Sequence, residues 1–571
     1  NSEGNAFSVS GFADFILYDG LKLTVNGSVT IDETRSTTMR NPYYGQFVAN
    51  KGVLSKSHGR SYNHNLQQLL TYNKSFGAND EHTIDVLLGH ETYNLRSYSL
   101  GASKSNVFST DNLELDGAVV DMSSASSSFG EYVNEGYFFR AMYEYDGRIF
   151  ASASYRRDAS SHFHPDHRWG NFWSVGAAWI INRENWFNAP VFSMLKLKAS
   201  IGSQGNDQIG SYMYTDLYSI LNDGNGGISV LWGQKGNPNI TWETNTNINV
   251  GVEFGLWQDR LTGSIDFFNR LTTDMLFSVP VAPSMGYSSY YDNVGDMVNR
   301  GIEIVLNADI VRTQNVVWSF NVNMTHYKNK VLSLHESRKN LTINGHPGYS
   351  TGNGFIAEGL PVTTWFLPTY AGPDPTTGEA SWYYTDANGE RKTSVIWGDA
   401  SGVESREIQG DSTPKLFGGF GTTLYAYGFD LSIAFDYQIG GLVYDSGYAS
   451  YMESPTSAST GKNYHVDLLD SWSKSNPDSQ IPRFQFADQY TTATSNYFLI
   501  DGSYLNISNI NIGYTFPSQW MNKIKISSLR VYVAADNVIY WSQRKGFDPR
   551  GTGNNNYSPI RTVSGGITLT F

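Results

Sequence analysis

The sequence predicts an all-β membrane protein, a transmembrane antiparallel up-and-down β-barrel. Apolar and polar residues alternate along many segments, as in Leu21–Asp32 and Trp318–Thr325. Side chains of a strand point to opposite faces with period two, so each segment has one apolar face and one polar face. Charged residues are 16% of the chain and aromatic residues 14%, and the mean hydropathy is −0.36. This combination is typical of a barrel with lipid outside and water inside.

About seventeen segments carry the strand pattern. Every second residue is apolar in Ile248–Leu256, Ile302–Ile310, Leu431–Tyr437 and Leu529–Ala535. The expected strands in chain order are 6–18, 21–32, 58–75, 82–97, 134–145, 148–157, 171–182, 191–202, 243–257, 261–278, 300–311, 316–329, 415–427, 430–440, 497–516, 528–540 and 563–571.

One expected strand changes phase along its length. Leu505 and Ile507 occupy odd positions, whereas Ile510 and Ile512 occupy even ones. A β-bulge near Ser508–Asn509 would keep all four side chains on one face. The alternative is that Leu505 and Ile507 point inward, against a plug.

The connections between these strands alternate between short and long throughout the chain. The short ones lie at Asp19–Gly20, Gly77–Asp80, Asp146–Gly147, 183–190, Gln258–Arg260, Arg312–Asn315, Gly428–Phe429 and Pro517–Ser527. The long ones are 33–57, 98–133, 158–170, 203–242, 279–299, 330–414, 441–496 and 541–562. Outer-membrane barrels have short periplasmic turns and long extracellular loops. The long connections are therefore expected to face the cell exterior.

The parity of the connections also predicts how the chain relates to a whole barrel. The first strand ends in a short turn and the last follows a long loop, so both run towards the periplasm, where the chain ends at Phe571. Bacterial single-chain barrels have even strand numbers. We therefore expect an odd number of strands before Asn1, and we expect residues 1–571 to be the C-terminal part of a larger barrel, without its plug and first strands.

Composition excludes several other classes of protein. The chain has no cysteine, which removes disulfide and thiolate–metal sites. It has no apolar run of about 18 residues, which excludes a helical membrane span. The net charge of −13 argues against nucleic acid as a partner. No signal peptide is visible at Asn1, so the chain is expected to be mature or a fragment.

Several motifs in the second half of the barrel region are long and ordered along the chain. They are Gly236–Glu243, Asn249–Gly255, Arg260–Asp266, Asn293–Glu303, Asp501–Ile507, Gly513–Pro517, Ser528–Val533, Asp536–Val538 and Gly546–Pro549. In these motifs the chain resembles the SusC/RagA family of TonB-dependent transporters. The resemblance covers about Arg156 to Phe571, and residues 1–155 add strands without a motif.

The resemblance implies a barrel of about 22 strands in the outer membrane, preceded by a plug and a TonB-contacting segment. It implies import of oligosaccharides or peptides, energised through TonB, with a SusD-like surface lipoprotein as a lid over the barrel. It also allows a dimer of this two-protein complex. It implies no enzymatic activity and no cofactor. The alternatives are a TonB-dependent siderophore or cobalamin receptor, a passive porin and a soluble β-rich glycan-binding protein.

Aromatic residues in the long connections are the candidate ligand-binding residues, because aromatic faces suit sugar rings or peptide side chains. They are Trp232, Trp365, Tyr370, Trp382, Tyr383 and Tyr448. The alternative is that these rings pack the loops together or contact the lid protein. Ile567, Leu569 and Phe571 share one face of the last strand and resemble the terminal signal by which outer-membrane barrels are recognised for assembly.

Three further groups of residues are expected to have no chemical role. His162, His164 and His167 could ligate a metal, but a solvated polar turn is the simpler interpretation. Asp386–Gly389 resembles part of a calcium loop and is expected to form a hairpin turn. Glu404 and Glu407 lack the setting of an acid/base pair. No metal site and no catalytic residue are therefore predicted.

Overall fold

The computed structural model describes residues 1–122, 125–455, 463–545 and 559–571. The chain divides into two compact units. The first comprises Asn1–Trp179, Ser200–Thr246 and Thr272–Val294, and the second comprises Ile180–Ala199, Asn247–Leu271 and Gly295–Phe571. Within the described ranges, no helix has the length and apolar character needed to cross a membrane.

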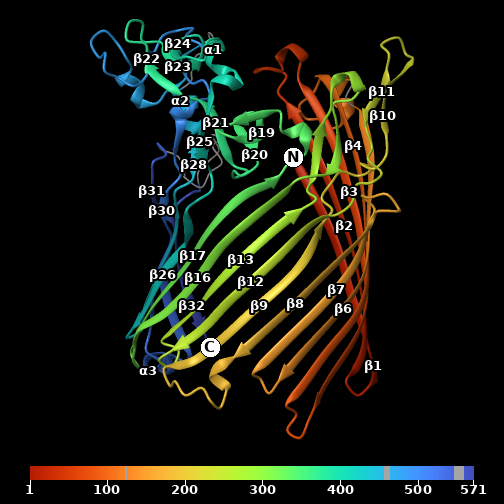
Figure 1. Ribbon diagram of the computed structural model, residues 1–571, viewed down its shortest axis with the longest axis vertical. Coiled ribbons are helices and arrows are strands. Elements are labelled where there is room, and N and C mark those ends of the chain that lie inside the picture. Colours follow the sequence, from red (N-terminus) through yellow and green to blue (C-terminus); the bar gives the residue numbers. More distant parts are fainter. Residues whose placement is uncertain (123–124, 456–462, 546–558) are drawn as a thin grey trace. The chain divides into compact units, whose positions relative to one another are not determined.

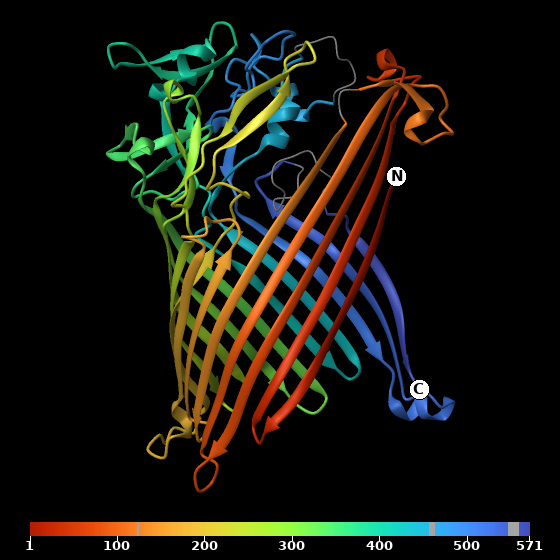
Figure 2. The same ribbon diagram turned by 90° about the vertical axis from the view of Figure 1, so that its right-hand side faces the viewer.

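Long antiparallel strands make up most of the first unit, and Figure 2 shows the red and orange ones running side by side. They are β1 (Ser2–Tyr18), β2 (Leu21–Arg40), β3 (Val53–Phe76), β4 (His82–Val107), β6 (Ser126–Tyr145), β7 (Ile149–Ser160) and β8 (Trp169–Ile180). The connections add η1 (Val48–Asn50), η2 (Leu115–Gly117), β5 (Ala118–Asp121), the hairpin β10 (Leu217–Asn222) and β11 (Ile228–Gln234), and the hairpin β14 (Leu276–Pro280) and β15 (Ser289–Asn293) with η4 (Pro283–Met285).

Besides β8, whose last residue Ile180 belongs to the second unit, three strands have residues in both units, and the remaining long strands belong to the second. The three are β9 (Phe192–Asn206), β12 (Glu243–Leu256) and β13 (Leu261–Thr273). The long strands of the second unit are β16 (Asp296–Arg312), β17 (Val316–Ser333), β26 (Leu416–Ala426), β27 (Phe429–Ile439), β30 (Tyr504–Thr515), β31 (Ser528–Ser542) and β32 (Thr562–Thr570). Its short turns contain η3 (Ile181–Arg183), α3 (Ser518–Met521) and η9 (Asn522–Ile524).

Two long connections of the second unit carry short elements of their own (Figure 1). The connection between β17 and β26 contains η5 (Glu336–Arg338), β18 (Leu341–Ile343), β19 (His346–Thr351), β20 (Gly354–Ala357), β21 (Thr364–Pro368), β22 (Tyr370–Pro373), β23 (Ala380–Thr385), β24 (Arg391–Ser394), α1 (Trp397–Ser401), η6 (Val403–Ser405) and β25 (Arg406–Asp411). The connection between β27 and β30 contains β28 (Leu442–Tyr444), α2 (Ser446–Met452), η7 (Val466–Asp470), η8 (Asn496–Phe498) and β29 (Leu499–Asp501).

The large sheet confirms the predicted all-β up-and-down fold. Among the residues that the structure describes it has 18 strands, and apart from the four-residue β5 each corresponds to one strand expected from the sequence. Strands adjacent in the chain pair antiparallel, from β1–β2 to β7–β8 and from β16–β17 to β31–β32. The alternation of connection lengths has one exception, because 161–168 is shorter than the supposedly short 181–191.

The strands of the first unit extend further than predicted. Residues 33–57 and 98–133, expected to be loops, are largely strand, because β2 continues to Arg40 and β4 to Val107. A strand crosses a bilayer in about 9–11 residues, whereas β4 has 26. The extra residues lie beyond the apolar band, where apolar and polar residues no longer alternate strictly. The period-two hydrophobic signal therefore ends there although the backbone pairing continues.

The predicted β-bulge in β30 is confirmed. The register with β31 shifts between Ile507 and Asn509, and the register with β27 shifts between Ala434 and Phe435. After this shift Ile507 lies opposite Phe435, and Ile510 lies opposite Ile433. Paired residues share a face, so the apolar side chains on both sides of the bulge point the same way.

Candidate functional site

A packed cluster in the first unit anchors three of the long connections. Ile240 and Trp242, from the Gly236–Glu243 motif, are buried against Phe163 and Phe172. The indole of Trp242 also donates to the carbonyl of Arg168 at 2.8 Å. Apolar burial and a satisfied indole N–H together fix the bases of the connections 161–168 and 207–242.

Hydrogen bonds tie a third connection to this cluster. The side chain of Asn293 accepts from the amide of Thr241 and donates to its carbonyl, both at 2.8 Å. The amide of Asn237 donates to the carboxylate of Asp292 at 2.9 Å. Two of the sequence motifs, Gly236–Glu243 and Asn293–Glu303, therefore meet here and have a structural role.

Trp232 lies on the hairpin formed by β10 and β11. Its ring is 6.0 Å from that of Tyr287 in a stacked arrangement, and 5.4 Å from the ring of Tyr218. The hairpin carries exposed apolar side chains, with Ile228 78% and Ile220 71% accessible. Trp232 itself keeps an exposed face, so it is available to a ligand or to a protein partner.

In the second unit, the described parts of the connections β17–β26 and β27–β30 pack into one structure, which we call the lobe (residues 334–415, 440–455 and 463–503). It has three apolar clusters of its own, centred on Phe355 and Phe366, on Trp382 and Ala400, and on Met452 and Phe498. Asn496 accepts from the amide of Tyr370 at 2.8 Å, which joins the two segments. The lobe is therefore a small folded body, where the sequence predicted loops.

Four of the predicted ligand-binding residues contribute to packing inside the lobe. The Trp365 indole donates to the carbonyl of Leu442 at 3.1 Å, and the Tyr370 hydroxyl donates to that of Gln480 at 3.1 Å. Trp382 is only 2% exposed, so its ring has no open face for a ligand in this conformation. Tyr448 donates to Asp467 at 2.7 Å and packs edge-on against His465. The alternative role, in which rings hold the loops together, fits these four positions.

Tyr383 is more accessible than these four. It lies on β23, beside the buried Trp382, and is partly exposed. The guanidinium carbon of Arg391 lies 4.1 Å from its ring centroid, on one face of the ring. This cation–π contact covers one face of the ring, and the rest of the side chain stays partly exposed.

Burial raises the pKa of several tyrosines in the lobe. Desolvation raises the pKa of Tyr497 to about 12, with a smaller contribution from the negative charge of Asp467. The pKa of Tyr370 and that of Tyr448 are raised in the same direction, also mainly by burial. These hydroxyls remain neutral donors at physiological pH, which suits hydrogen bonding within the lobe.

A row of exposed aromatic residues in the lobe was missed by the sequence prediction. Tyr464 and Phe484 pack edge-on with ring centroids 5.1 Å apart, and Phe486 and Tyr490 are exposed close by in the chain. The signal that could have found them is the cluster of aromatic residues in 484–490 within an otherwise polar stretch. These rings are the open aromatic surface of the lobe.

Arg483 fixes the segment that carries this row. Its guanidinium pairs with both carboxylate oxygens of Asp488, at 2.7 and 2.9 Å, and with Glu379 at 3.0 Å. It also donates to the carbonyl of Thr377 at 3.0 Å. The bidentate bond to Asp488 raises the pKa of Arg483 further above its ordinary value. A guanidinium with four such bonds holds two segments in one geometry.

The residues expected to have no chemical role have ordinary structural partners. His162 bonds the carbonyl of Asp207 at 2.9 Å, and His164 packs edge-on against Tyr214. Asp386–Gly389 forms the predicted hairpin turn between β23 and β24, with Gly389 at φ +81°. Glu407 accepts from Thr369 at 2.7 Å. Among described residues, no group of three or more His, Cys, Asp and Glu is arranged to hold a metal ion.

The last strand presents the predicted terminal residues together. Ile567 lies opposite Val531 and Leu569 opposite Leu529, so the apolar face of β32 continues that of β31. Phe571 follows the end of β32 and is exposed. The Gly546–Pro549 motif lies outside the described residues.

A sequence model described as "TonB dependent receptor-like, beta-barrel" matches residues 3–401. The chain is 27% identical to TonB-dependent receptor P3 of Formosa agariphila, over 88% of this chain and 52% of that protein. It is 26% identical to TonB-dependent receptor SusC of Bacteroides thetaiotaomicron, over 93% of this chain and 51% of that protein. The chain thus spans about half the length of these relatives.

Solved structures give a similar result. The chain is similar to a chain of the RagAB peptide transporter with a TM-score of 0.86 and 26% identity, over 100% of this chain and 62% of that one. The same match is found with the RagAB peptide importer in its "open-open" state, with a TM-score of 0.86. The likeness includes the connections as well as the sheet, because it covers the whole chain.

Proposed function

The chain belongs to the TonB-dependent receptor β-barrel family, and on that premise we propose that the protein imports oligosaccharides or peptides across the outer membrane, energised through TonB. The observation that most supports this proposal is the lobe, which offers an open aromatic row, Tyr464, Phe484, Phe486 and Tyr490, on a rigid base. Ordered loops with exposed rings suit extended polar ligands better than compact metal chelates. A catalytic role is not part of the proposal.

The residues proposed to contact cargo are Trp232, Tyr383 and the aromatic row. Each has an exposed or partly exposed ring, in contrast to Trp382. Trp365, Tyr370 and Tyr448 act indirectly, by fixing the lobe that presents the row. Substitution of Phe486 or Tyr490 by Ala would then weaken cargo binding, whereas Trp382→Ala would disturb the lobe itself.

We also propose a surface lipoprotein of the SusD type as the partner, with TonB acting through parts of the protein outside this chain. The exposed Ile220 and Ile228 of the β10–β11 hairpin support a protein contact there, because apolar side chains of this size are costly to leave in water. Ile220→Asp together with Ile228→Asp should abolish co-purification of the lipoprotein. A dimer of the two-protein complex is part of the same proposal.

The proposal is tested by uptake in cells that carry the full-length protein. Deletion should remove uptake of one class of labelled oligosaccharide or peptide, and inactivation of TonB should have the same effect. Mass spectrometry of cargo bound to the native complex would identify the class. Uptake that persists without TonB, or a bound ferric chelate, would contradict the proposal.

The terminal residues Ile567, Leu569 and Phe571 are proposed as the assembly signal of the barrel. Their support is the shared apolar face of β31 and β32 and the exposure of Phe571.

A further inference from the structure

The apolar face of the first unit changes character along its strands. Leu70 of β3, Leu88 of β4 and Phe139 of β6 lie in one cross-strand row and are typical of a lipid-facing band. On β4, Tyr98 is ten residues beyond Leu88 on the same face. At about 3.4 Å per residue and a tilt of about 45°, that row is roughly 24 Å above Leu88. Because the apolar band of such a barrel is about 25 Å tall and contains Leu88, this row lies at the outer edge of the band or above it, on the side of the long connections.

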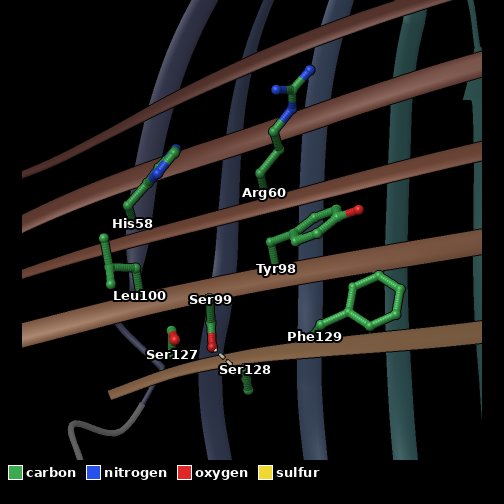
Figure 3. Close-up of a pocket in the computed structure, with 8 residues that line it drawn as sticks. All are labelled: His58, Arg60, Tyr98, Ser99, Leu100, Ser127, Ser128 and Phe129. Atoms are coloured by element: carbon green, nitrogen blue, oxygen red, sulfur yellow. Dashed lines mark hydrogen bonds between the residues drawn. The ribbon is translucent and has the colours of Figure 1, made fainter. Parts of the chain in front are cut away.

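A groove opens on this face at that height (Figure 3). Eight residues from β3, β4 and β6 line a space of about 490 Å³: His58, Arg60, Tyr98, Ser99, Leu100, Ser127, Ser128 and Phe129. Six of them form two cross-strand rows on this face, because Arg60 pairs with Tyr98 and Tyr98 with Phe129, whereas His58 pairs with Leu100 and Leu100 with Ser127. Ser99 and Ser128 pair with each other between these rows, and their side chains belong to the opposite face. A second groove shares His58 and Leu100 and lengthens this surface.

The groove presents aromatic faces to solvent. Tyr98 is 50%, Phe129 55% and Leu100 58% exposed, and the two rings are 5.0 Å apart at an angle of 45°. Aromatic side chains at this height are typical of the girdle that borders the headgroup region around a barrel. Contiguous exposed apolar groups rimmed by polar ones mark a binding surface.

A free guanidinium lies beside these rings. On the same face, Arg35 binds Glu33 at 2.7 Å and Arg96 binds Glu131 at 2.8 Å. None of the ion pairs among described residues uses Arg60, which is exposed. His58 on the neighbouring row bonds Glu33 at 2.8 Å and thereby has a fixed ring position. The groove therefore combines two aromatic faces, one unpaired cation and hydroxyl groups.

We propose that this groove binds the anionic core oligosaccharide of the lipopolysaccharide that surrounds the barrel. The C–H faces of pyranose rings pack on Tyr98 and Phe129, the Arg60 guanidinium pairs with a phosphate of the sugar chain, and Ser127 bonds hydroxyl groups. The membrane itself is the source of the ligand, because the groove is on the lipid-facing side and opens at the height of the saccharide layer. The proposal does not depend on which cargo is imported.

Native mass spectrometry of the full-length protein in detergent, with lipid-free core oligosaccharide as the probe, tests the proposal. The variants are Tyr98→Ala, Phe129→Ala and Arg60→Gln, and Tyr44→Ala in the exposed connection 41–52 is the matched control. Each aromatic variant should weaken binding about five- to tenfold, the range expected for one ring contact. Arg60→Gln should weaken binding of the native core and leave that of enzymatically dephosphorylated core unchanged. The control should bind as the unmodified protein does.

Three results would overturn the proposal. One is equal binding by the unmodified protein and by the variant with all three substitutions. Another is equally tight binding of maltoheptaose, a neutral soluble oligosaccharide, which would show no preference for the membrane's own saccharide. The third comes from a photocrosslinker attached to Phe129→Cys, which is a single attachment point because this chain has no cysteine. In whole cells, capture of a second copy of the chain or of another protein, instead of lipopolysaccharide, would overturn the proposal. Heat-modifiable migration in gels confirms that each variant is folded.

Discussion

The side chain of Asn293 forms a closed pair of hydrogen bonds with the backbone of Thr241, accepting from its N–H and donating to its carbonyl, each at 2.8 Å. The same amide also donates to the carbonyl of Asp274 at 3.0 Å. One asparagine thus replaces the backbone partners that Thr241 would have in a sheet, and it links two long connections of the first unit. An isosteric but charged residue could not donate in this way, because a carboxylate only accepts.

We predict that Asn293→Ala loosens the two connections. Loss of three hydrogen bonds at about 1 kcal/mol each should lower the local free energy of unfolding by about 2–3 kcal/mol. Limited proteolysis should then cut 207–242 many times faster, while the long strands remain protected. Asn225→Ala, in the exposed turn between β10 and β11, is the control and should have no effect. Equal cleavage rates for both variants would contradict the prediction.

Arg483→Lys should open the lobe almost as much as Arg483→Ala does. Lysine keeps the charge but cannot reproduce the bidentate bond to Asp488 or reach Glu379 at the same time. Hydrogen exchange should become faster in 374–379 and 483–488. The cargo proposed to bind the aromatic row should bind more weakly. Lys474→Ala, at an exposed position of the same connection, serves as the control. If Arg483→Lys kept the hydrogen-exchange protection of the unmodified protein in these two segments, the prediction would be wrong.

The lobe should lose stability in alkali within a defined pH range. The pKa of Tyr497 is raised to about 12 by burial, whereas that of an unfolded tyrosine is about 10. The folded lobe therefore retains a proton that the unfolded chain releases, so the stabilisation is complete below about pH 10 and is lost as the pH rises through 12. Absorbance at 295 nm should show that Tyr497→Phe removes a late-titrating group. Because Tyr370 and Tyr448 also titrate late, the late phase should become smaller and not disappear. A late phase of unchanged amplitude in Tyr497→Phe would show that the assignment is wrong.

Deletion of Ser508 should prevent the barrel from folding, whereas Ser508→Ala should be tolerated. The deletion removes the extra residue of the bulge and turns either Leu505 and Ile507 or Ile510 and Ile512 to the opposite face. The alanine variant loses only the hydroxyl bond to the carbonyl of Ala434, 3.1 Å long and worth about 1 kcal/mol. Heat-modifiable gel migration distinguishes folded from unfolded protein. If the deletion variant folded, the register of β30 with β27 and β31 could shift by one residue without a large loss of stability, and the prediction would be wrong.

Phe571→Ser should slow assembly into the membrane without lowering the stability of barrels that do assemble. Phe571 follows the last strand and is exposed, so the folded state loses little with its ring. Pulse-chase measurement of assembly in cells gives the rate, and thermal unfolding of the purified variant gives the stability. Leu569→Ala, which alters the apolar face within β32, should affect both. A stability loss in Phe571→Ser without delayed assembly would assign this residue a packing role instead.

Much of the sheet could be predicted from the sequence, because the surroundings of each strand impose the alternation of apolar and polar residues along it. In strands such as β16, lipid on one face and water on the other force alternation, as at Ile302–Ile310. The ends of β2 and β4 were predicted too short for the same reason: past Ile31 and Leu88 no lipid enforces the pattern, and hydrogen bonding alone maintains the strand. The bulge at Ser508 was predictable because it breaks an alternation that is otherwise strict.

The site was less predictable, because aromatic composition does not distinguish a buried ring from an open one. Trp382 and Tyr383 are neighbours in sequence, yet one is buried in a cluster and the other partly exposed. What separates them is the contact of Trp382 with Ala400 and Trp397, residues that reach it through the folding of the whole connection. The aromatic row of 464–490 was overlooked because its position depends on Arg483 and its partners, which only tertiary structure brings together.

The lobe is assembled from two stretches of chain that enter on either side of the β26–β27 hairpin. Tyr370 with Asn496, and Arg483 with Glu379, join them at the level of single side chains. Recombination that exchanged one stretch alone would remove one partner of each of these two hydrogen bonds. For the cargo binding that we propose for the lobe, the part of the chain that must stay together is therefore both stretches with the intervening hairpin, roughly from β17 to β30. Grafting experiments that aim to redirect transport should move that block whole.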